Sequence, residues 1–171
     1  MNHERIRLGG GVRRFHTRPT IDHQTVAAHS WGVAALLFEI CDPSVNLLRA
    51  AIYHDVAEYD TGDIPATAKW MSKSLKATLD ELELQIERGL GIEAANLSRE
   101  ERWLLKFADM LELVWYSVEQ RKMGNRYAEE WYENGTAWME KAQAEFNTPR
   151  LSAAIAEVEN AWSNLYEGEP S

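Results

Sequence analysis

The sequence predicts an all-α, single-domain helical bundle over residues 1–171. Apolar residues recur at helical spacing along nearly the whole chain, and the alternating apolar pattern of β-strands is scarce. A chain of 171 residues has the usual size of one domain and can bury a core. We identify no internal repeat, low-complexity linker or domain boundary.

The first half of the chain is expected to hold a short helix, a loop and two longer helices. Residues 1–20 contain three successive glycines, which favour a short helix followed by a loop. Apolar residues at helical spacing predict helices over about 24–40 and 43–59. Asp42 can cap the second of these, with Pro43 at its first position, where the missing amide hydrogen costs nothing.

The second half, after a loop over 61–65, is expected to be helical throughout. A third long helix is marked by an apolar stripe and ends near two glycines: Leu75, Leu79, Leu82, Ile86, Gly89 and Gly91. Ser98 and Glu101 form a capping box for a fourth helix. Thr148, followed by a proline, repeats the cap-and-proline pattern at the start of the last helix.

Composition and charge narrow the class of protein. The chain has 27 acidic and 18 basic residues and a net charge of −9, which disfavours a nonspecific nucleic-acid surface. No apolar stretch approaches the ~20 residues that span a bilayer, and the start lacks an apolar signal core. The one cysteine, Cys41, cannot form an intramolecular disulfide, which suits a reducing compartment. We therefore expect a cytoplasmic protein that binds neither nucleic acid nor membrane.

Much of the positive charge lies early in the chain. Five arginines fall within the first 18 residues: Arg5, Arg7, Arg13, Arg14 and Arg18. A few basic side chains in one cleft can hold a phosphate even in an acidic protein, and a divalent cation assists them. This asymmetry predicts a local site for a small anion.

Four polar residues in apolar helical contexts are candidate metal ligands. His54 and Asp55 are adjacent near the end of an apolar helix, and imidazole with carboxylate suits zinc, cobalt or manganese. Neighbouring helical residues point about 100° apart, so further ligands must come from other helices. His29 has apolar neighbours one turn away on both sides. Asp109 does too, and a carboxylate there must be paired, hydrogen-bonded or metal-bound.

Each candidate alone also has an ordinary explanation. A single histidine on a helix is more often a core or surface residue than a ligand, and a His-Asp dipeptide by itself is a weak signal. Asp109 could instead pair with an arginine. The metal site is predicted by the combination of these residues on three helices.

These residues resemble a known superfamily, the HD-domain phosphohydrolases. A closer resemblance, to the bacterial HD-type 5'-deoxynucleotidases, is carried by Arg14-Phe15, His29, the segment His-Asp-Val-Ala-Glu-Tyr-Asp-Thr-Gly-Asp-Ile-Pro over 54–65, and Lys69-Trp70. The same residues resemble short phage HD-domain enzymes that hydrolyse deoxynucleoside triphosphates, including dATP. The resemblance covers about 14–70 and the helix around Asp109, and it implies an HD-type helical bundle.

The resemblance implies a role for each matching residue. The catalytic divalent metal (zinc, cobalt or manganese) would be held by His29, His54, Asp55 and Asp109. Glu58, expected on the same helix face as the metal pair, would act as general acid or base. Asp63 would contact substrate near the sugar, and Arg14 would orient the phosphate. Phe15, where the bacterial enzymes have tryptophan, would be an aromatic platform beside the base, and Lys69 could hold phosphate.

Two positions depart from the family pattern. Ala28 precedes the metal histidine where an acidic residue is common, so a contact made by that acid is absent or supplied elsewhere. Ala66 stands where a threonine is usual in the monophosphatases, which weakens the transfer of that hydroxyl contact.

The expected reaction is attack of a metal-activated water on the phosphorus next to the sugar, with Arg14 and Lys69 neutralising charge. It would release phosphate from a monophosphate or tripolyphosphate from a triphosphate, and a triphosphate substrate could bring additional magnesium. One alternative is a noncatalytic, metal-containing, nucleotide-binding regulatory module. Another, alarmone or cyclic-nucleotide hydrolysis, is disfavoured by the Gly-Asp-Ile-Pro turn.

Seven tryptophans are more than a small core needs. Several lie on predicted helices, including Trp103, Trp115, Trp131 and Trp138, and they would serve either local packing or contact with another subunit. Because relatives form dimers or larger rings, the resemblance implies a homo-oligomer.

Overall fold

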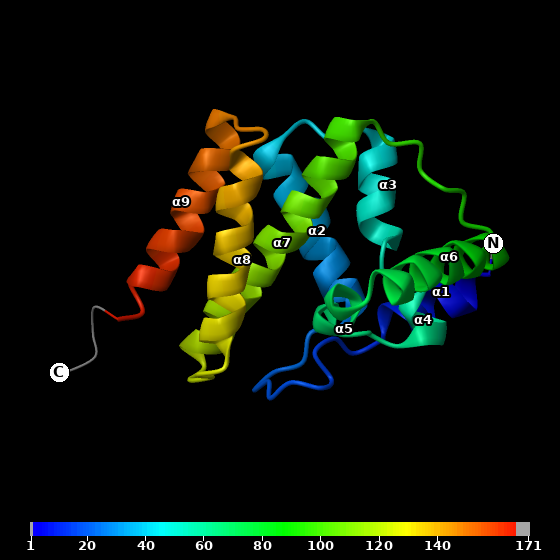
Figure 1. The fold of residues 1–171 in the computed structure, drawn as a ribbon, viewed down its shortest axis with the longest axis horizontal. Helices are drawn as coiled ribbons and strands as arrows, with labels where there is room; N and C mark the ends of the chain where they lie inside the picture. Colours follow the sequence, from blue (N-terminus) through cyan, green and yellow to red (C-terminus); the bar gives the residue numbers. More distant parts are fainter. Residues whose placement is uncertain (1, 167–171) are drawn as a thin grey trace.

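The computed structural model describes residues 2–166, without the side chains of Ala66 and Trp70. This part of the chain folds into the helices α1 (His3–Gly10), α2 (Val26–Ile40), α3 (Val45–Tyr53), α4 (Glu58–Thr61), α5 (Ala66–Met71), α6 (Lys73–Leu90), α7 (Arg99–Lys122), α8 (Ala128–Gln143) and α9 (Pro149–Ser163). It contains no β-strand, and Arg13 and Thr25 form only an isolated antiparallel bridge. The all-α prediction is confirmed (Figure 1).

The main core lies around α7, which packs against α2, α3, α8 and α9. In Figure 1, α7 crosses the middle of the molecule, with α8 and α9 on one side and α3 on the other. Fully buried side chains join these helices: Leu37, Leu47, Phe107, Leu111, Met139 and Leu151. Removal of this apolar surface from water is the main stabilising term of the bundle.

Several helices begin or end at the capping residues that the sequence predicts. Ser98 accepts the N–H of Glu101 at 3.1 Å, and the Glu101 carboxylate accepts the N–H of Ser98 at 2.8 Å, which completes the capping box of α7. The Thr148 hydroxyl caps α9 by accepting the N–H of Leu151 at 3.2 Å, with proline at the first helical position. Gly91 ends α6 in the left-handed conformation, at φ 75°, which glycine adopts without strain.

The predicted cap of the second long helix is wrong. α3 begins at Val45, and its cap is Ser44, whose hydroxyl accepts the N–H of Leu47 at 3.1 Å. Asp42 lies in the preceding loop, where the guanidinium of Arg150 pairs with it at 3.1 Å. A long-range ion pair therefore replaces the local capping bond that the sequence suggests.

The continuous helix expected over 43–59 is also interrupted. α3 ends at Tyr53, residues 54–57 form turns, and Glu58 begins the separate helix α4. The N–H of Glu58 donates to the carbonyl three residues earlier, at 3.0 Å, in place of the regular helical bond. The metal pair and Glu58 therefore do not share one helix face.

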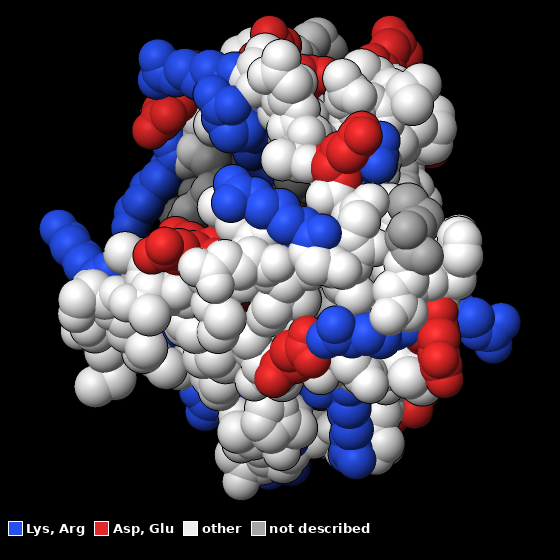
Figure 2. Space-filling view, turned by 90° about the vertical axis from the view of Figure 1, so that its right-hand side faces the viewer, with Lys and Arg blue, Asp and Glu red and all other residues white. Residues whose placement is uncertain are grey.

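α6 has the predicted extent, but part of its apolar stripe is not covered by the described chain. Leu75 and Leu82 are each 41% exposed, whereas Leu79 is buried. Figure 2 views the molecule from the right-hand side of Figure 1, and basic and acidic side chains are interspersed there among uncharged ones. None of the described helices is both long and apolar enough to cross a membrane.

The tryptophans considered for subunit contacts pack mainly within the chain. Trp131 is buried, and the other three lie half-buried against the main core; Trp103, for example, stacks on Phe107 with ring centroids 5.0 Å apart. Among the tryptophans whose side chains the structure describes, the exposed one is Trp31 on α2, at 72%.

Candidate metal centre and active site

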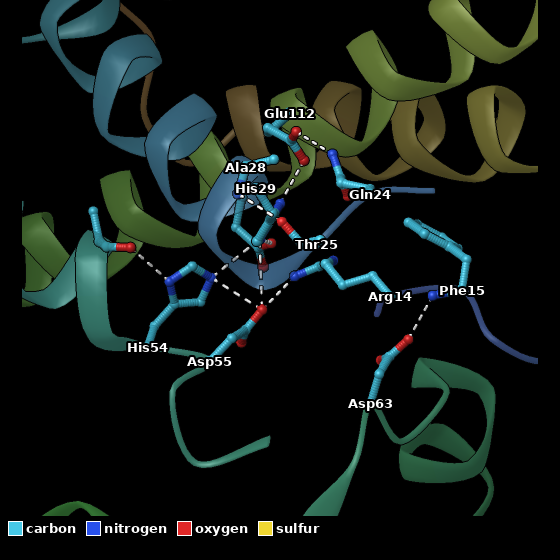
Figure 3. Close-up of polar contacts among 12 residues, drawn as sticks. Arg14, Phe15, Gln24, Thr25, Ala28, His29, His54, Asp55, Asp63 and Glu112 are labelled. Carbon is cyan, nitrogen blue, oxygen red and sulfur yellow. Dashed lines mark hydrogen bonds and ion pairs between the residues drawn. The ribbon is translucent and has the colours of Figure 1, made fainter. Parts of the chain in front are cut away.

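Three of the four predicted metal ligands, His29, His54 and Asp55, have donor atoms within 4.8 Å of one another, and the fourth, Asp109, contacts His29. His29 lies in the first half of α2, His54 and Asp55 directly follow α3, and Asp109 lies in the middle of α7. From His29 Nε2, the distances are 3.2 Å to His54 Nε2, 3.6 Å to Asp55 Oδ2 and 3.2 Å to Asp109 Oδ1. His54 Nε2 and Asp55 Oδ2 lie 3.5 Å apart. Figure 3 shows the two imidazoles and Asp55 pointing toward one another.

Hydrogen bonds on the outer nitrogens orient both imidazoles. His29 Nδ1 lies against a carboxylate oxygen of Glu112, and His54 Nδ1 lies 2.9 Å from the carbonyl oxygen of Ala51. Both partners are acceptors, so each imidazole donates from Nδ1 and turns Nε2 inward. This arrangement is typical of metal-binding histidines, whose second nitrogen is held by a carboxylate or a backbone carbonyl.

The spacing and charge of the four donors fit a divalent cation. Ligands about 2.0–2.1 Å from a tetrahedral zinc ion lie about 3.4 Å from one another, close to the 3.2–3.6 Å among His29, His54 and Asp55. Asp109 approaches this group through His29, with Oδ1 3.2 Å from Nε2. Burial lowers the pKa of His29, but hydrogen bonds to Asp109 and Glu112 outweigh it and raise that pKa to about 9. The centre therefore attracts positive charge, which a bound cation supplies.

Both carboxylates of the centre are kept ionised. Burial acts to raise the pKa of Asp109, but its hydrogen bond with His29 and the charge of Lys106 hold that pKa well below its usual value. Lys106 Nζ lies 2.7 Å from Asp109 Oδ2, so the basic partner is a lysine and not the arginine considered from the sequence. The pKa of Asp55 is lowered because nearby positive groups, His54 first, outweigh burial.

Glu58 lies beside this centre with unused hydrogen-bonding capacity. Its side chain is buried, and Oε2 has no hydrogen-bond partner among the described residues. Burial and the neighbouring charge of Asp55 raise the pKa of Glu58 to about 8. A carboxyl group with such a pKa can exchange a proton near neutral pH.

Arg14 and Phe15 are held over the same centre by two aspartates. The Arg14 guanidinium forms a hydrogen-bonded ion pair with Asp55, and only a small part of the Arg14 side chain is exposed to solvent. Phe15 has φ 55°, a conformation that non-glycine residues rarely adopt. Its N–H donates to Asp63 Oδ2 at 2.7 Å (Figure 3). Asp63, which is expected to contact substrate, therefore also supports the backbone that carries both side chains.

The Phe15 ring belongs to an aromatic stack. Its centroid lies 5.1 Å from that of Tyr116 and 5.2 Å from that of Trp131, with nearly parallel planes. Trp131 lies on α8, so the N-terminal loop is anchored on the C-terminal half of the chain. One side of this stack borders the cavity described next.

A cavity of about 470 Å³ opens beside the centre. It is lined by Asp55, Glu58, Asp63 and Asp109, by Phe15 and Trp131, and by five basic residues: Arg14, Arg18, Lys69, Lys76 and Lys106. Lys69 Nζ lies 3.2 Å from a carboxylate oxygen of Glu83, so it is paired with α6 while it faces the cavity. Of the five early arginines, two line the cavity, and Arg5 instead pairs with Asp60.

Two residues of the centre were not found from the sequence. Glu112 holds His29, and the Gln24 side chain donates to Glu112 at 2.6 Å. The carboxylate that contacts His29 therefore comes from α7 and not from position 28. Glu112 carried a signal, because it is a carboxylate within the apolar run 110–114 and lies one turn after Asp109. Gln24 carried none, because its partner is 88 positions away.

Comparison with solved structures shows what this fold resembles. The HD phosphohydrolase DatZ of cyanophage S-2L, solved with dA and one catalytic Zn²⁺ ion, matches with a TM-score of 0.70 and 22% identity, over 96% of this chain and 97% of that one. A protein of Pyrococcus horikoshii matches with a TM-score of 0.69 and 21% identity, over 96% and 98%. An HD-domain phosphohydrolase of Listeria innocua matches with a TM-score of 0.65 and 19% identity, over 95% of each chain.

Comparison with protein families adds a sequence relationship. None of the curated proteins compared with this chain matches it. The family model described as 5'-deoxynucleotidase YfbR-like matches residues 7–160, which include every predicted site residue. The chain therefore belongs to the YfbR-like 5'-deoxynucleotidase family and is a deoxynucleotide phosphohydrolase.

Proposed function

We propose that the chain cleaves the 5'-phosphoester of deoxynucleotides with one divalent cation held by His29, His54, Asp55 and Asp109. The observation that carries this proposal is the convergence of the His29, His54 and Asp55 donor atoms, all within 4.8 Å of one another, with Asp109 Oδ1 3.2 Å from His29 Nε2 and both imidazoles fixed through Nδ1. When bound, the cation supplies Lewis-acid polarisation of a phosphate oxygen and lowers the pKa of water. We infer zinc, because the spacing and the two-imidazole donor set suit it; cobalt and manganese are the alternatives.

The remaining residues position the phosphate and move protons. Arg14 neutralises charge on the reacting phosphate from one side of the cavity, and Lys69 does so after exchanging its partner Glu83 for substrate. Glu58 takes a proton from the attacking water or gives one to the leaving oxygen. Its Oε2, which no described residue hydrogen-bonds, favours this catalytic role over a purely regulatory, noncatalytic site. Asp63 and Phe15 bind the sugar and base.

We infer that the substrate carries more than one phosphate. Five basic residues line the cavity, whereas one phosphate group next to the cation needs one or two. Four of the five pair with carboxylates, and we propose that Lys69 and Lys76 exchange Glu83 and Asp80 for outer phosphates. A deoxynucleoside triphosphate, such as dATP, would then release tripolyphosphate, with magnesium bound to the outer phosphates. Deoxyadenosine in the DatZ structure supports an adenine base as the first candidate. A monophosphate that releases phosphate is the alternative.

An activity panel tests this proposal. The zinc-, cobalt- and manganese-reconstituted protein is assayed with deoxynucleoside mono-, di- and triphosphates, and phosphate and tripolyphosphate are quantified separately. We expect tripolyphosphate from triphosphates and no turnover by the His54→Ala variant. Phosphate release from monophosphates alone would overturn the triphosphate assignment, and no turnover of any deoxynucleotide would support the regulatory module.

We further propose that the chain forms a homo-oligomer and acts in the cytoplasm. Trp31 and Phe38 lie seven residues apart on α2, and both are exposed. Large apolar side chains grouped on one helix face are typical of contact surfaces. The free Cys41 suits a reducing compartment, and the excess of acidic residues favours a small-molecule partner over nucleic acid. Light scattering after size-exclusion chromatography measures the stoichiometry.

A further inference from the structure

We infer that Glu112 and Gln24 are positioning residues that hold His29 with its Nε2 directed at the cation. The inference rests on the proposed metal centre but concerns two residues outside its four ligands. Glu112 lies one turn after Asp109 on α7, so successive turns of one helix face both nitrogens of the same imidazole. Figure 3 shows Gln24, Glu112 and His29 as a connected chain of polar contacts.

The chain of contacts leaves the Glu112 carboxylate little freedom. Its Oε2 accepts from His29 Nδ1, and its Oε1 accepts from Gln24 Nε2 at 2.6 Å. All three side chains are buried, so water does not compete for these bonds. A carboxylate with each oxygen engaged cannot rotate, and it therefore fixes both the tautomer and the ring orientation of His29.

A glycine makes room for this contact. Gly32 follows His29 by one turn of α2, and a Cβ atom placed there would lie 2.9 Å from Glu112 Cγ. A side chain at position 32 would therefore push Glu112 away from the imidazole. The close approach of α2 and α7 at Gly32 is what lets a carboxylate of one helix reach a histidine of the other.

Gln24 extends the chain of contacts to the phosphate-orienting arginine. Its carbonyl oxygen accepts the N–H of Arg14 at 2.9 Å, while its side chain donates to Glu112. One residue thus links the backbone of Arg14 to the ligand His29. Loosening this link should lower kcat more than it raises KM, because the alignment of cation and guanidinium matters most in the transition state.

The experiment measures metal binding independently of turnover. Zinc affinity is determined by competition with a chromophoric chelator, and the visible spectrum of the cobalt-substituted protein reports the geometry around the ion. We expect Glu112→Gln and Glu112→Ala to weaken zinc binding by about 10- to 100-fold and to change the cobalt spectrum. The Gln variant keeps the side-chain volume, so it remains informative if the Ala variant does not fold.

A charge-swapped pair gives a sharper test. In Glu112→Gln, an NH₂ group replaces one of the two accepting carboxylate oxygens. This NH₂ group must face a hydrogen-bond donor, either His29 or Gln24, so one of the two contacts is lost. Combining Glu112→Gln with Gln24→Glu lets the amide at 112 accept from His29 and donate to the new carboxylate at 24. We expect this double variant to bind zinc more tightly than either single variant, whereas additive losses would argue against a connected pair.

Gln120→Leu is the matched structural control. Gln120 is a buried amide on the same helix, and it accepts the N–H of Ile21, close to Gln24 in the chain, at 3.0 Å. This variant should lose stability yet keep the wild-type zinc affinity and cobalt spectrum. If wild type binds zinc and both Glu112 variants bind within twofold of it, the positioning role is wrong. If wild type itself binds no zinc, the proposed metal centre fails instead.

Discussion

Glu58 illustrates how burial and charge can prepare one side chain for proton transfer. Burial and Asp55 raise its pKa to about 8, so the protonated form is favoured in the folded protein at neutral pH. In the unfolded chain, the same group titrates near 4.5. This difference links the protonation of one residue to the stability of the fold.

The first prediction concerns that linkage in protein stripped of metal. Between pH 4.5 and about 8, the folded state holds a proton that the unfolded state has lost, so stability falls as pH rises. The stabilising contribution of the Glu58 proton is complete below pH 4.5, the pKa of this group in the unfolded chain. It is lost as the pH rises through about 8, the pKa of the group in the folded protein. Relative to wild type, the unfolding free energy of Glu58→Gln should increase by up to a few kcal/mol across this pH interval. Urea unfolding at several pH values measures the difference, and a constant difference would contradict it.

The second prediction concerns turnover by the metal-loaded protein. Glu58→Gln should keep the cation, because Glu58 is not among the four donors, but should lower kcat by about 10²- to 10⁴-fold. Metal content and steady-state kinetics are measured on the same sample. Wild-type activity in this variant would remove Glu58 from the mechanism.

Asp63 gives a third prediction, about the loop that carries Arg14 and Phe15. Asp63→Ala removes the acceptor of the Phe15 N–H, which supports a backbone at positive φ. We expect a loss of about 1.5–3 kcal/mol of unfolding free energy and a raised KM. Asp60→Ala, which removes an exposed ion pair with Arg5, is the control and should cost at most about 1 kcal/mol. Equal effects of the two variants would argue against the supporting role.

At the scale of the elements, the sequence predicted helix starts and ends correctly where the residues that form the cap lie within a few positions of one another. The capping box at Ser98 and the glycine at the end of α6 act within a few residues, and both were predicted. The cap at Asp42 failed because Arg150, more than a hundred residues away, pairs with that carboxylate. The break after Tyr53 was missed because apolar spacing continues through it, without a glycine or proline to mark the turn.

The fourth prediction tests the close packing of two helices. A Cβ atom at Gly135 of α8 would lie 2.4 Å from Val114 Cγ2 of α7. Gly135→Ala should therefore lower stability by about 1–3 kcal/mol, because one helix must move. Gly89→Ala, in α6 where the added atom meets nothing within 4 Å, should raise stability by about 0.5–1 kcal/mol. Denaturant unfolding of both variants measures the contrast, and a loss in both would contradict the packing argument.

At the scale of the whole molecule, the candidate centre was only partly readable from the sequence. His29, His54, Asp55 and Asp109 could be named because their types and order resemble a family. The hydrogen bonds between Gln24, Glu112 and His29 depend on how α2 and α7 cross, and a pattern along the chain does not specify that crossing. The candidate ligands could thus be named from the sequence, whereas the side chains that hold them in place could not.

The fifth prediction concerns removal of the metal. A cation that binds only the folded protein adds about 2.7 kcal/mol when its concentration is 100 times Kd, which for 171 residues raises Tm by several degrees. Adding zinc to stripped wild type should therefore raise Tm. His54→Ala should not respond, although its folded state is otherwise similar. Calorimetric scans with and without zinc decide this, and an equal shift in both proteins would place the zinc elsewhere.

α8 contributes to the cavity without contributing to the predicted metal centre. Trp131, Glu130 and Asn134 line the cavity from this helix, whereas the four donor atoms come from α2, α7 and the turn after α3. The wall that α8 gives the cavity can therefore be changed without replacing a predicted metal ligand. If this wall contacts the nucleobase, a mutant library at 130 and 134 should alter the base preference while zinc binding stays intact.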